Sequence, residues 1–278
     1  MSIAELLRNT PIFPLAKSVR KKFLIAMGKQ HPIQAAKVSN KYPLIHLGSE
    51  YGGWIFVDVP ELKGSTILAA GLGEDASFDV EFATHFEASI VIVDPTPRAV
   101  EHFNGITARL GQGKTSEYSQ GGCQTVESYD LSKLSPEQLK LEPVALWVEN
   151  TTVKFYEPKN KQHVSHSITN YQNDFSEETD FKEVPAFTIA SVLEKHSINP
   201  DSLQLVKLDI EGAEIEVVKN MMAENILPRQ LLLEFDELNV PSKKSVSRVD
   251  QTHKLLLQKG YQLIYTDGMA DFLYVHDM

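Results

Sequence analysis

Cysteine is nearly absent from this sequence, since Cys123 is the only one among 278 residues. A single cysteine excludes disulfides within the chain and metal sites built from several thiolates. It also suits a reducing compartment, so we expect a cytoplasmic protein. Long apolar runs are missing too, and no segment approaches the roughly 18 apolar residues that a membrane-spanning helix needs. Pro11 and Pro14 interrupt the N-terminal apolar residues, and we therefore expect no signal peptide.

Positive charge is also scarce, because 27 lysines and arginines stand against 37 acidic residues and give a formal net charge of −10. A negative chain repels polyanions, so we expect no nucleic-acid partner. Internal repeats of solenoid length are missing. The length suits one large α/β domain with an appended segment. The sequence leaves homo-oligomerisation open.

Several short runs are apolar without alternation, which is typical of strands buried on both faces of a parallel sheet. They are "TILAA" (66–70), "SIVIVD" (89–94), "VALWV" (144–148), "LQLVKLD" (203–209) and "QLLLEFD" (230–236). Segments with helical spacing separate them. This order predicts a doubly wound α/β fold with ligands at the carboxyl ends of the strands. The segments "YQLIY" and "DFLYVHD" are predicted to close the sheet as an antiparallel pair.

Two regions fall outside this alternation. Residues 1–60 are predicted to form an N-terminal cap of helices and a short strand pair around "YPLIHLGSEYGGWIFV", and residues 61–278 the main domain. Residues 149–185 form a long polar insertion that contains aromatic residues. Loops of this length in compact domains are usually functional or disordered. We expect the insertion to lie on the substrate side.

The glycine-rich segment "GLGEDA" (71–76) follows the first predicted strand. It fits a G-x-G-x-x-A dinucleotide pattern, with Asp94 at the distance of a ribose-binding acid. A tight turn without a ligand is the alternative explanation for the glycines, and Asp94 also suits a helix N-cap. Glu74 and Asp75 would repel a pyrophosphate by ~1 kcal/mol for each close pair. They favour S-adenosylmethionine, which is cationic and carries no phosphate.

The segment "LVKLDIEGAEIEVVKNM" (205–221) resembles the signature of the FkbM-family methyltransferases, an apolar strand that runs into an Asp-x-Glu-Gly-Ala-Glu turn and a helix. Similarity to that family extends over roughly residues 65–240, through "FTIASVLEKH" and "LLLEFDEL". The resemblance implies a class I methyltransferase fold, Rossmann-like and doubly wound, with a mostly parallel seven-stranded sheet whose last strand is antiparallel. It also implies S-adenosyl-L-methionine as the cofactor.

The same resemblance implies roles for individual residues. Asp94 would bind the ribose, and Glu149 falls where a residue contacts adenine. The strand end "LAAG" lacks the acid that many methyltransferases have there, so the contact to the cofactor's amino group is expected from the loop. The residues implied to form that methionine-side loop are Gly71, Gly73, Glu74 and Asp75.

Candidate catalytic residues follow the later strands and lie in the insertion. Asp209 and Glu211 follow a predicted strand, where a carboxylate could take the proton of a hydroxyl acceptor, although helix capping explains Asp209 equally. His163 and His166 could act as a base or orient the acceptor, and surface histidines are the alternative.

A metal site is a further hypothesis for the strand ends. Asp209, Glu234 and Asp236 could converge on Mg²⁺, which would lower the pKa of the acceptor hydroxyl. Neighbouring strand ends also gather acids without metal.

Together these features predict an S-adenosylmethionine-dependent methyltransferase that acts on a hydroxyl of a small molecule or saccharide. An NAD(P)-dependent oxidoreductase and a non-catalytic nucleoside-binding domain are the alternatives. No motif that we can read identifies the acceptor.

Overall fold

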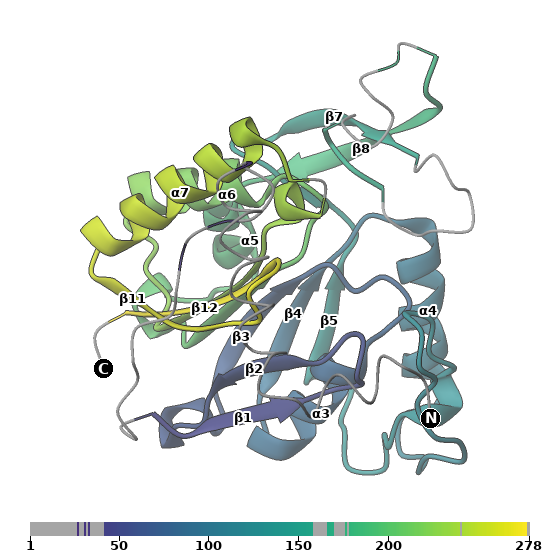
Figure 1. The fold of residues 1–278 in the computed structure, drawn as a ribbon. Coiled ribbons are helices and arrows are strands. Elements are labelled where there is room, and N and C mark those ends of the chain that lie inside the picture. The colour runs from purple at the N-terminus through teal and green to yellow at the C-terminus, as the bar shows by residue number, and fades with distance from the viewer. Residues whose placement is uncertain are drawn as a thin grey trace, which may run out of the picture.

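The computed structural model of the chain describes Met27, His31, Ile33 and residues 42–157, 166–169, 176, 178–239 and 241–276. Its centre is a seven-stranded sheet of order β11-β12-β10-β9-β3-β4-β5 (Figure 1). The strands are β3 (Thr66–Ala70), β4 (Ser89–Val93), β5 (Leu139–Glu142), β9 (Leu205–Leu208), β10 (Gln230–Glu234), β11 (Tyr261–Thr266) and β12 (Asp271–His276). The last strand, β12, runs antiparallel to both of its neighbours, and β10, β9, β3, β4 and β5 pair in parallel. The predicted mostly parallel seven-stranded sheet is confirmed.

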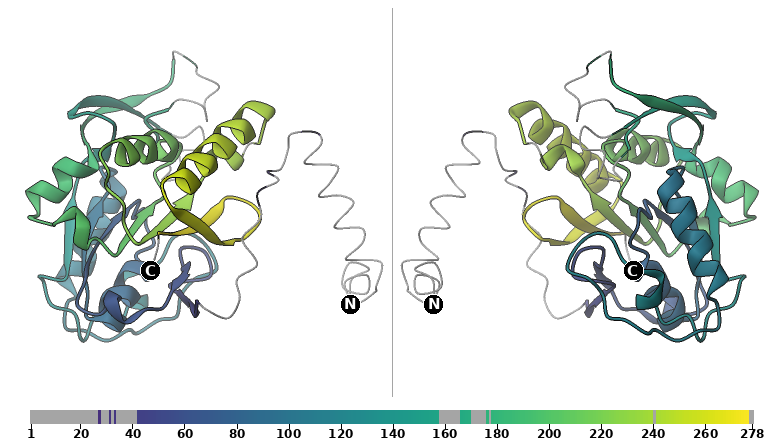
Figure 2. Two further views of the ribbon diagram at one scale, coloured as in Figure 1. Left: turned by 90° about the vertical axis from the view of Figure 1, so that its left-hand side faces the viewer. Right: turned by 90° about the vertical axis from the view of Figure 1, so that its right-hand side faces the viewer.

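Helices cover both faces of this sheet. The helices are α3 (Ser77–Phe86), α4 (Pro97–Ala108), α5 (Ile189–Lys195), α6 (Glu214–Ala223) and α7 (Lys243–Gln258). Apolar residues of α3 and α4 share one buried cluster, and those of α5, α6 and α7 share the other. The side views in Figure 2 show α4 and α7 on opposite sides of the molecule. Within the described ranges, no helix is long and apolar enough to cross a membrane.

A short strand pair packs against the α3 side. Strands β1 (Leu44–Leu47) and β2 (Trp54–Val57) are antiparallel and lie in the segment where a strand pair was predicted. Phe56 of β2 contacts the phenylalanines of α3, with ring centroids 5.4–5.9 Å apart. The buried side chain of Gln230 bonds the backbone nitrogen and oxygen of Val57 at 2.8 and 2.9 Å, which fixes β2 to the main sheet. The helices expected before this pair lie outside the described residues.

The prediction for "VALWV" is wrong in its pairing. Only β6 (Ala145–Leu146) forms there, in a separate sheet of order β6-β8-β7 with β7 (Thr151–Tyr156) and β8 (Phe181–Phe187). The edge of the main sheet is β5, whose sequence "LKLE" is buried only at its two ends, Leu139 and Glu142. Burial of an apolar run shows that its side chains are covered, but it does not show which strand its backbone pairs with. The insertion therefore contributes a second small sheet beside the main one.

Candidate active site

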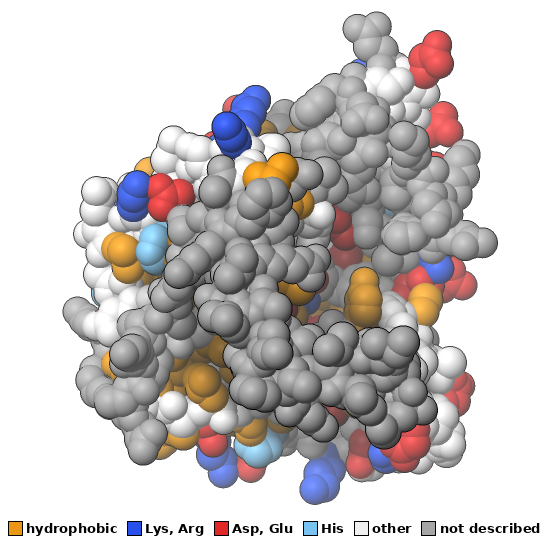
Figure 3. Space-filling view, viewed as in Figure 1, with side chains coloured by type: hydrophobic (Ala, Val, Ile, Leu, Met, Phe, Trp, Pro, Cys, Tyr) orange, Lys and Arg blue, Asp and Glu red, His pale blue; other side chains and the backbone are white. Residues whose placement is uncertain are grey.

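A cavity of about 850 Å³ lies across the carboxyl ends of the central strands. Its walls come from the loops after β3, β4, β9 and β10, from the β1–β2 and β11–β12 turns, and from the small second sheet. The space-filling view shows acidic and apolar side chains in a hollow to the right of the centre (Figure 3). This is the edge at which doubly wound sheets bind their ligands.

The glycine loop owes part of its sequence to close packing. Gly71 has φ +87° and Gly73 φ +55°, a region that other residues rarely adopt. A side chain at Gly71 would collide with the carbonyl oxygen of Asp209, where the ends of β3 and β9 meet. The Gly71 nitrogen donates to the carbonyl of Val93 at 3.0 Å. Gly71 therefore has a structural role, which is the explanation of the loop that needs no ligand.

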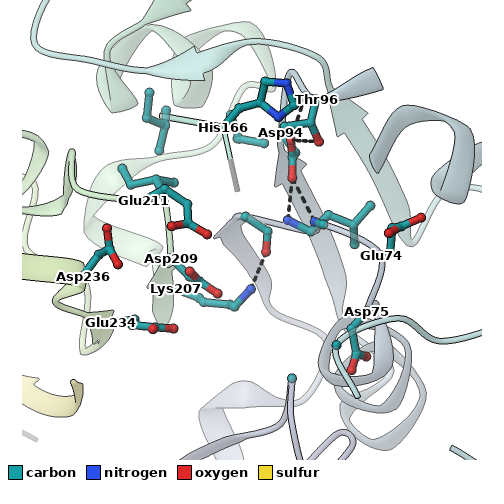
Figure 4. Close-up of a pocket in the computed structure, with 18 of the residues that line it drawn as sticks. Glu74, Asp75, Asp94, Thr96, His166, Lys207, Asp209, Glu211, Glu234 and Asp236 are labelled. Carbon is teal, nitrogen blue, oxygen red and sulfur yellow. Dashed lines mark hydrogen bonds between the residues drawn. The ribbon is translucent and has the colours of Figure 1, made fainter. Parts of the chain in front are cut away.

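Asp94 is buried at the end of β4 and organises the glycine loop (Figure 4). Its Oδ2 accepts hydrogen bonds from the backbone nitrogens of Leu72 and Gly73, both at 2.9 Å. Its Oδ1 accepts from the backbone nitrogen and the hydroxyl of Thr96 at 2.8 and 2.7 Å. Thr96, and not Asp94, is the N-cap of α4, since its hydroxyl accepts from Ala99. Asp94 also lines the cavity.

The two acids of the loop are engaged by the protein. Oε2 of Glu74 lies 2.5 Å from a guanidinium nitrogen of Arg98 and accepts from the Cys123 thiol at 2.8 Å. Asp75 is buried and accepts from the hydroxyl of Ser49 at 2.6 Å and the backbone nitrogen of Ser77 at 2.9 Å. One acid is thus neutralised, and the other ties the β1–β2 turn to α3. These two acids therefore do not by themselves disfavour a pyrophosphate in the loop.

Carboxylates from other strands gather on the opposite side of the cavity. Asp209 follows β9, Glu234 ends β10, and Asp236 begins a 3₁₀ turn (Asp236–Leu238). Figure 4 shows these three and Glu211 around one part of the cavity. Asp271, which the sequence analysis missed, begins β12 directly opposite Glu234.

Their mutual proximity and burial change how these acids ionise. Repulsion by Asp209, followed by burial, raises the pKa of Glu234 to about 8. Burial, followed by repulsion from Asp267 and Asp209, raises the pKa of Asp271 to about 7. Burial also raises the pKa of Asp209, against the attraction of Lys207, and the pKa of Asp236. The acids at this end of the cavity therefore keep their protons at a higher pH than ordinary carboxylic acids do.

Lys207 is a second residue that the sequence analysis missed. Of the described residues that line the cavity, it is the only lysine or arginine. Its buried ammonium donates to the carbonyl of Gly71 at 2.5 Å and lies 5.7 Å from the centroid of the Trp54 ring. A lysine inside the apolar run "LQLVKLD" was a readable signal, because a charge in a buried strand needs a specific reason.

The DIEGAE turn is fixed by its own last glutamate. Glu211 has φ +56° and is followed by Gly212 at φ +96°. The buried carboxylate of Glu214 accepts from the backbone nitrogens of Ile210 at 2.8 Å and Gly212 at 3.0 Å. The Ser167 hydroxyl donates to the carbonyl of Glu211, which connects the insertion to this turn.

The remaining predicted site residues are dispersed. His166 lines the cavity and stacks on Phe155, with ring centroids 5.6 Å apart. His163 lies outside the described residues. Glu149 is exposed and does not line the cavity, whose wall nearby is apolar and includes Val144 and Leu146. Among the described residues, no three histidine, cysteine or acidic side chains are grouped to hold a metal ion, so the Mg²⁺ hypothesis gains no support.

A mostly parallel seven-stranded sheet, flanked by helices and with a cavity across its strand ends, is compatible with a methyltransferase fold. The family model described as "Methyltransferase FkbM domain" matches residues 49–263, which is most of the chain. The chain therefore belongs to the FkbM methyltransferase family, as its resemblance indicated, and this membership supports methyltransferase activity. Comparisons with curated proteins and with solved structures found no match.

Proposed function

We propose that the protein is an S-adenosylmethionine-dependent methyltransferase that acts on a hydroxyl oxygen of a small molecule or saccharide. One observation carries the proposal. A single cavity joins a glycine loop and an apolar wall at one end to a group of carboxylates at the other. The first end suits a nucleoside, and the second suits a polar acceptor.

The residues of the first end fit the nucleoside of the cofactor. Val144, Leu146 and Phe155 offer apolar contacts for adenine. Asp94 already accepts four hydrogen bonds, about as many as a carboxylate can. The Thr96 hydroxyl is the donor that a ribose hydroxyl can replace without moving the backbone. Ribose binding by Asp94 therefore requires the Thr96 hydroxyl to turn away, which also affects its cap on Ala99 at the start of α4.

The charge of the cavity favours a cation. Nine of its described lining residues are acidic, against one lysine. They are Glu74, Asp75, Asp94, Asp209, Glu211, Glu234, Asp236, Asp267 and Asp271. Such a lining disfavours a pyrophosphate, whereas a sulfonium or an ammonium beside these acids lowers their raised pKa values and is stabilised by the charge that they regain. The acids after β9, β10 and in β12 thus supply the preference that the loop acids do not.

When bound, S-adenosylmethionine supplies an electrophilic methyl group on a positively charged sulfur. Alignment and exclusion of water provide most of the gain in such a transfer, so the protein needs few catalytic groups. A hydroxyl acceptor must lose a proton, and we assign its removal to Asp209. This carboxylate lies at the end of β9, between the two ends of the cavity, and burial raises its pKa, which makes it a stronger base than an ordinary carboxylate. His166 belongs to the apolar wall through its stacking on Phe155.

Calorimetric titration with S-adenosylhomocysteine and with NAD⁺ tests the cofactor. We expect the first to bind and the second not to bind. The Asp94→Ala variant should weaken binding of S-adenosylhomocysteine, because the glycine loop loses the two bonds at 2.9 Å that hold it. Binding of NAD⁺ alone would contradict the proposal and favour the oxidoreductase.

Transfer of tritium from labelled S-adenosylmethionine to small-molecule fractions of a cell extract tests the activity. In the Asp209→Asn variant we expect transfer to fall by a factor of about 10² or more, while the affinity for S-adenosylhomocysteine stays within about threefold. The Asp58→Asn variant, at an exposed acid outside the cavity, serves as the control. Binding without transfer to any fraction would favour a non-catalytic domain.

A further inference from the structure

We propose that the acceptor carries a protonated amine, and that the acidic end of the cavity, defined as Glu234, Asp236 and Asp271, binds this amine. The inference rests on the proposed function of the same cavity. It names a chemical class for the acceptor, namely hydroxyl compounds that also bear an ammonium group, such as amino alcohols and amino sugars.

The position of the acidic end separates it from the nucleoside end. Asp94 follows β4, Asp209 follows β9, Glu234 ends β10 and Asp271 begins β12, in the order in which these strands lie in the sheet. Neighbouring strands are about 4.8 Å apart, so β10 and β12 lie about 10 and 14 Å from β3, which leads into the glycine loop. The acceptor has to lie on this side, beyond Asp209.

One carboxylate oxygen of Asp236 has no hydrogen-bond donor among the described residues. Its side chain is 6% exposed and lines the cavity. Its Oδ1 accepts from the Asn239 amide at 2.8 Å, whereas no donor among the described residues lies within hydrogen-bond distance of its buried Oδ2. Leaving such an oxygen without a partner costs free energy. The ionised carboxylate needs a donor at this oxygen, and an ammonium group offers three N–H bonds and favours the ionised form.

The charges of this end distinguish an ammonium from a neutral hydroxyl. Glu234 and Asp271 are directly opposite each other on β10 and β12, an arrangement that repulsion disfavours. The one lysine of the described cavity lining, Lys207, is bonded to the carbonyl of Gly71 in the glycine loop. Without a ligand this repulsion is relieved by bound protons, since the pKa of Glu234 is raised to about 8 and that of Asp271 to about 7. A neutral hydroxyl leaves the protons in place, whereas a bound ammonium group takes over their role and lets the two acids ionise.

Binding of the amine as a cation also determines which atom is methylated. An ammonium nitrogen has no lone pair and cannot attack a methyl group. Carboxylates around it stabilise the protonated form and keep it unreactive. A hydroxyl of the same molecule, near Asp209, then remains as the nucleophile. The acidic end therefore explains selectivity for oxygen in a molecule that contains both groups.

Calorimetry with matched probes tests the inference. The probes are 2-aminoethanol against ethane-1,2-diol and D-glucosamine against D-glucose, each titrated at pH 7 into protein saturated with S-adenosylhomocysteine. We expect at least one amine to bind at least about tenfold more tightly than its neutral counterpart. In the Asp236→Asn variant this preference should fall to about threefold or less. The Asp58→Asn variant should keep it, since that acid is exposed and outside the cavity.

Several results would overturn the inference. The first is equal or tighter binding of the neutral probes. The second is no binding of either amine at ~10 mM, about ten times the upper end of ordinary KM values. The third is an unchanged preference in Asp236→Asn. Circular dichroism checks that Asp236→Asn folds. If it does not fold, Glu234→Gln is used in its place. Titration of S-adenosylhomocysteine alone tests the proposed function separately. The amine preference is also measured in the absence of S-adenosylhomocysteine, so either proposal can fail while the other stands.

Discussion

Replacing Gly71 with alanine tests whether the glycine loop is shaped by the meeting of β3 and β9. Gly71 has φ +87°, and an added Cβ would run into the backbone carbonyl of Asp209. Gly64 has φ +68° and no atom within 4 Å of an added Cβ. Gly64→Ala therefore measures the cost of the left-handed backbone alone. Gly71→Ala measures that cost together with the collision.

The magnitudes follow from these two contributions. A left-handed backbone costs a residue with a Cβ ~1–2 kcal/mol. Overpacking against a backbone atom that cannot rotate away adds ~1–3 kcal/mol. We therefore expect Gly64→Ala to lower the free energy of unfolding by ~1–2 kcal/mol and Gly71→Ala by ~2–5 kcal/mol. Both variants should still fold, because domains commonly have ~5–15 kcal/mol of stability.

Urea unfolding followed by circular dichroism gives the two free energies, and calorimetry gives the affinity for S-adenosylhomocysteine. Gly71→Ala should lose affinity, because the displaced loop carries the backbone nitrogens that Asp94 holds. Gly64→Ala should keep wild-type affinity. Equal losses of stability in the two variants would refute the reasoning, since the collision with Asp209 would then have no effect.

Two further predictions concern other carboxylates. The pKa of Glu234 is raised from 4.5 to about 8, so the folded protein holds a proton that the unfolded chain releases. The contribution of this proton to the free energy of unfolding is complete below pH 4.5 and is lost as the pH rises through 8. Chemical unfolding at pH 5 and pH 8.5 should show this fall, and Glu234→Gln should reduce it; an unchanged fall would contradict the assignment. Asp75→Ala should lower the free energy of unfolding by ~1–3 kcal/mol, because Ser49 and Ser77 lose a buried acceptor. The same measurement on Asp58→Ala, at an exposed position, should show a change within ~0.5 kcal/mol, and similar losses in both variants would contradict this role.

Apolar runs predicted the centre of the sheet because its strands are buried on both faces. The runs 66–70, 89–94, 203–209 and 230–236 all contain strands of the main sheet. The same signal failed for 144–148, because burial of Val144 and Leu146 says nothing about backbone pairing. It also missed β5, where only the first and the last of the four residues are buried. Hydrophobic pattern thus located the core better than the edges.

Site residues were predictable where one strand end carries them and were missed where distant segments meet. Asp94, Asp209 and Glu234 line the cavity as their positions after strands indicated, and their roles remain predictions. Asp271 becomes relevant only through the register of β12 against β10. The partners of Glu74 come from α4 and from a loop almost fifty residues later, and no local pattern shows that they neutralise it.

The β1–β2 turn has a consequence for how acceptor preference can change. Tyr51, Gly52 and Gly53 form part of the cavity wall although they precede every strand of the main sheet. The Ser49 hydroxyl donates a hydrogen bond to Asp75 and fixes the base of the turn, so the tip can vary while the base stays in place. Gly52 has no room for a side chain, because an added Cβ would lie 2.7 Å from Asp75, whereas the side chain of Tyr51 is exposed. Variation at Tyr51 is therefore expected to reshape the cavity wall without disturbing the sheet or the base of the turn.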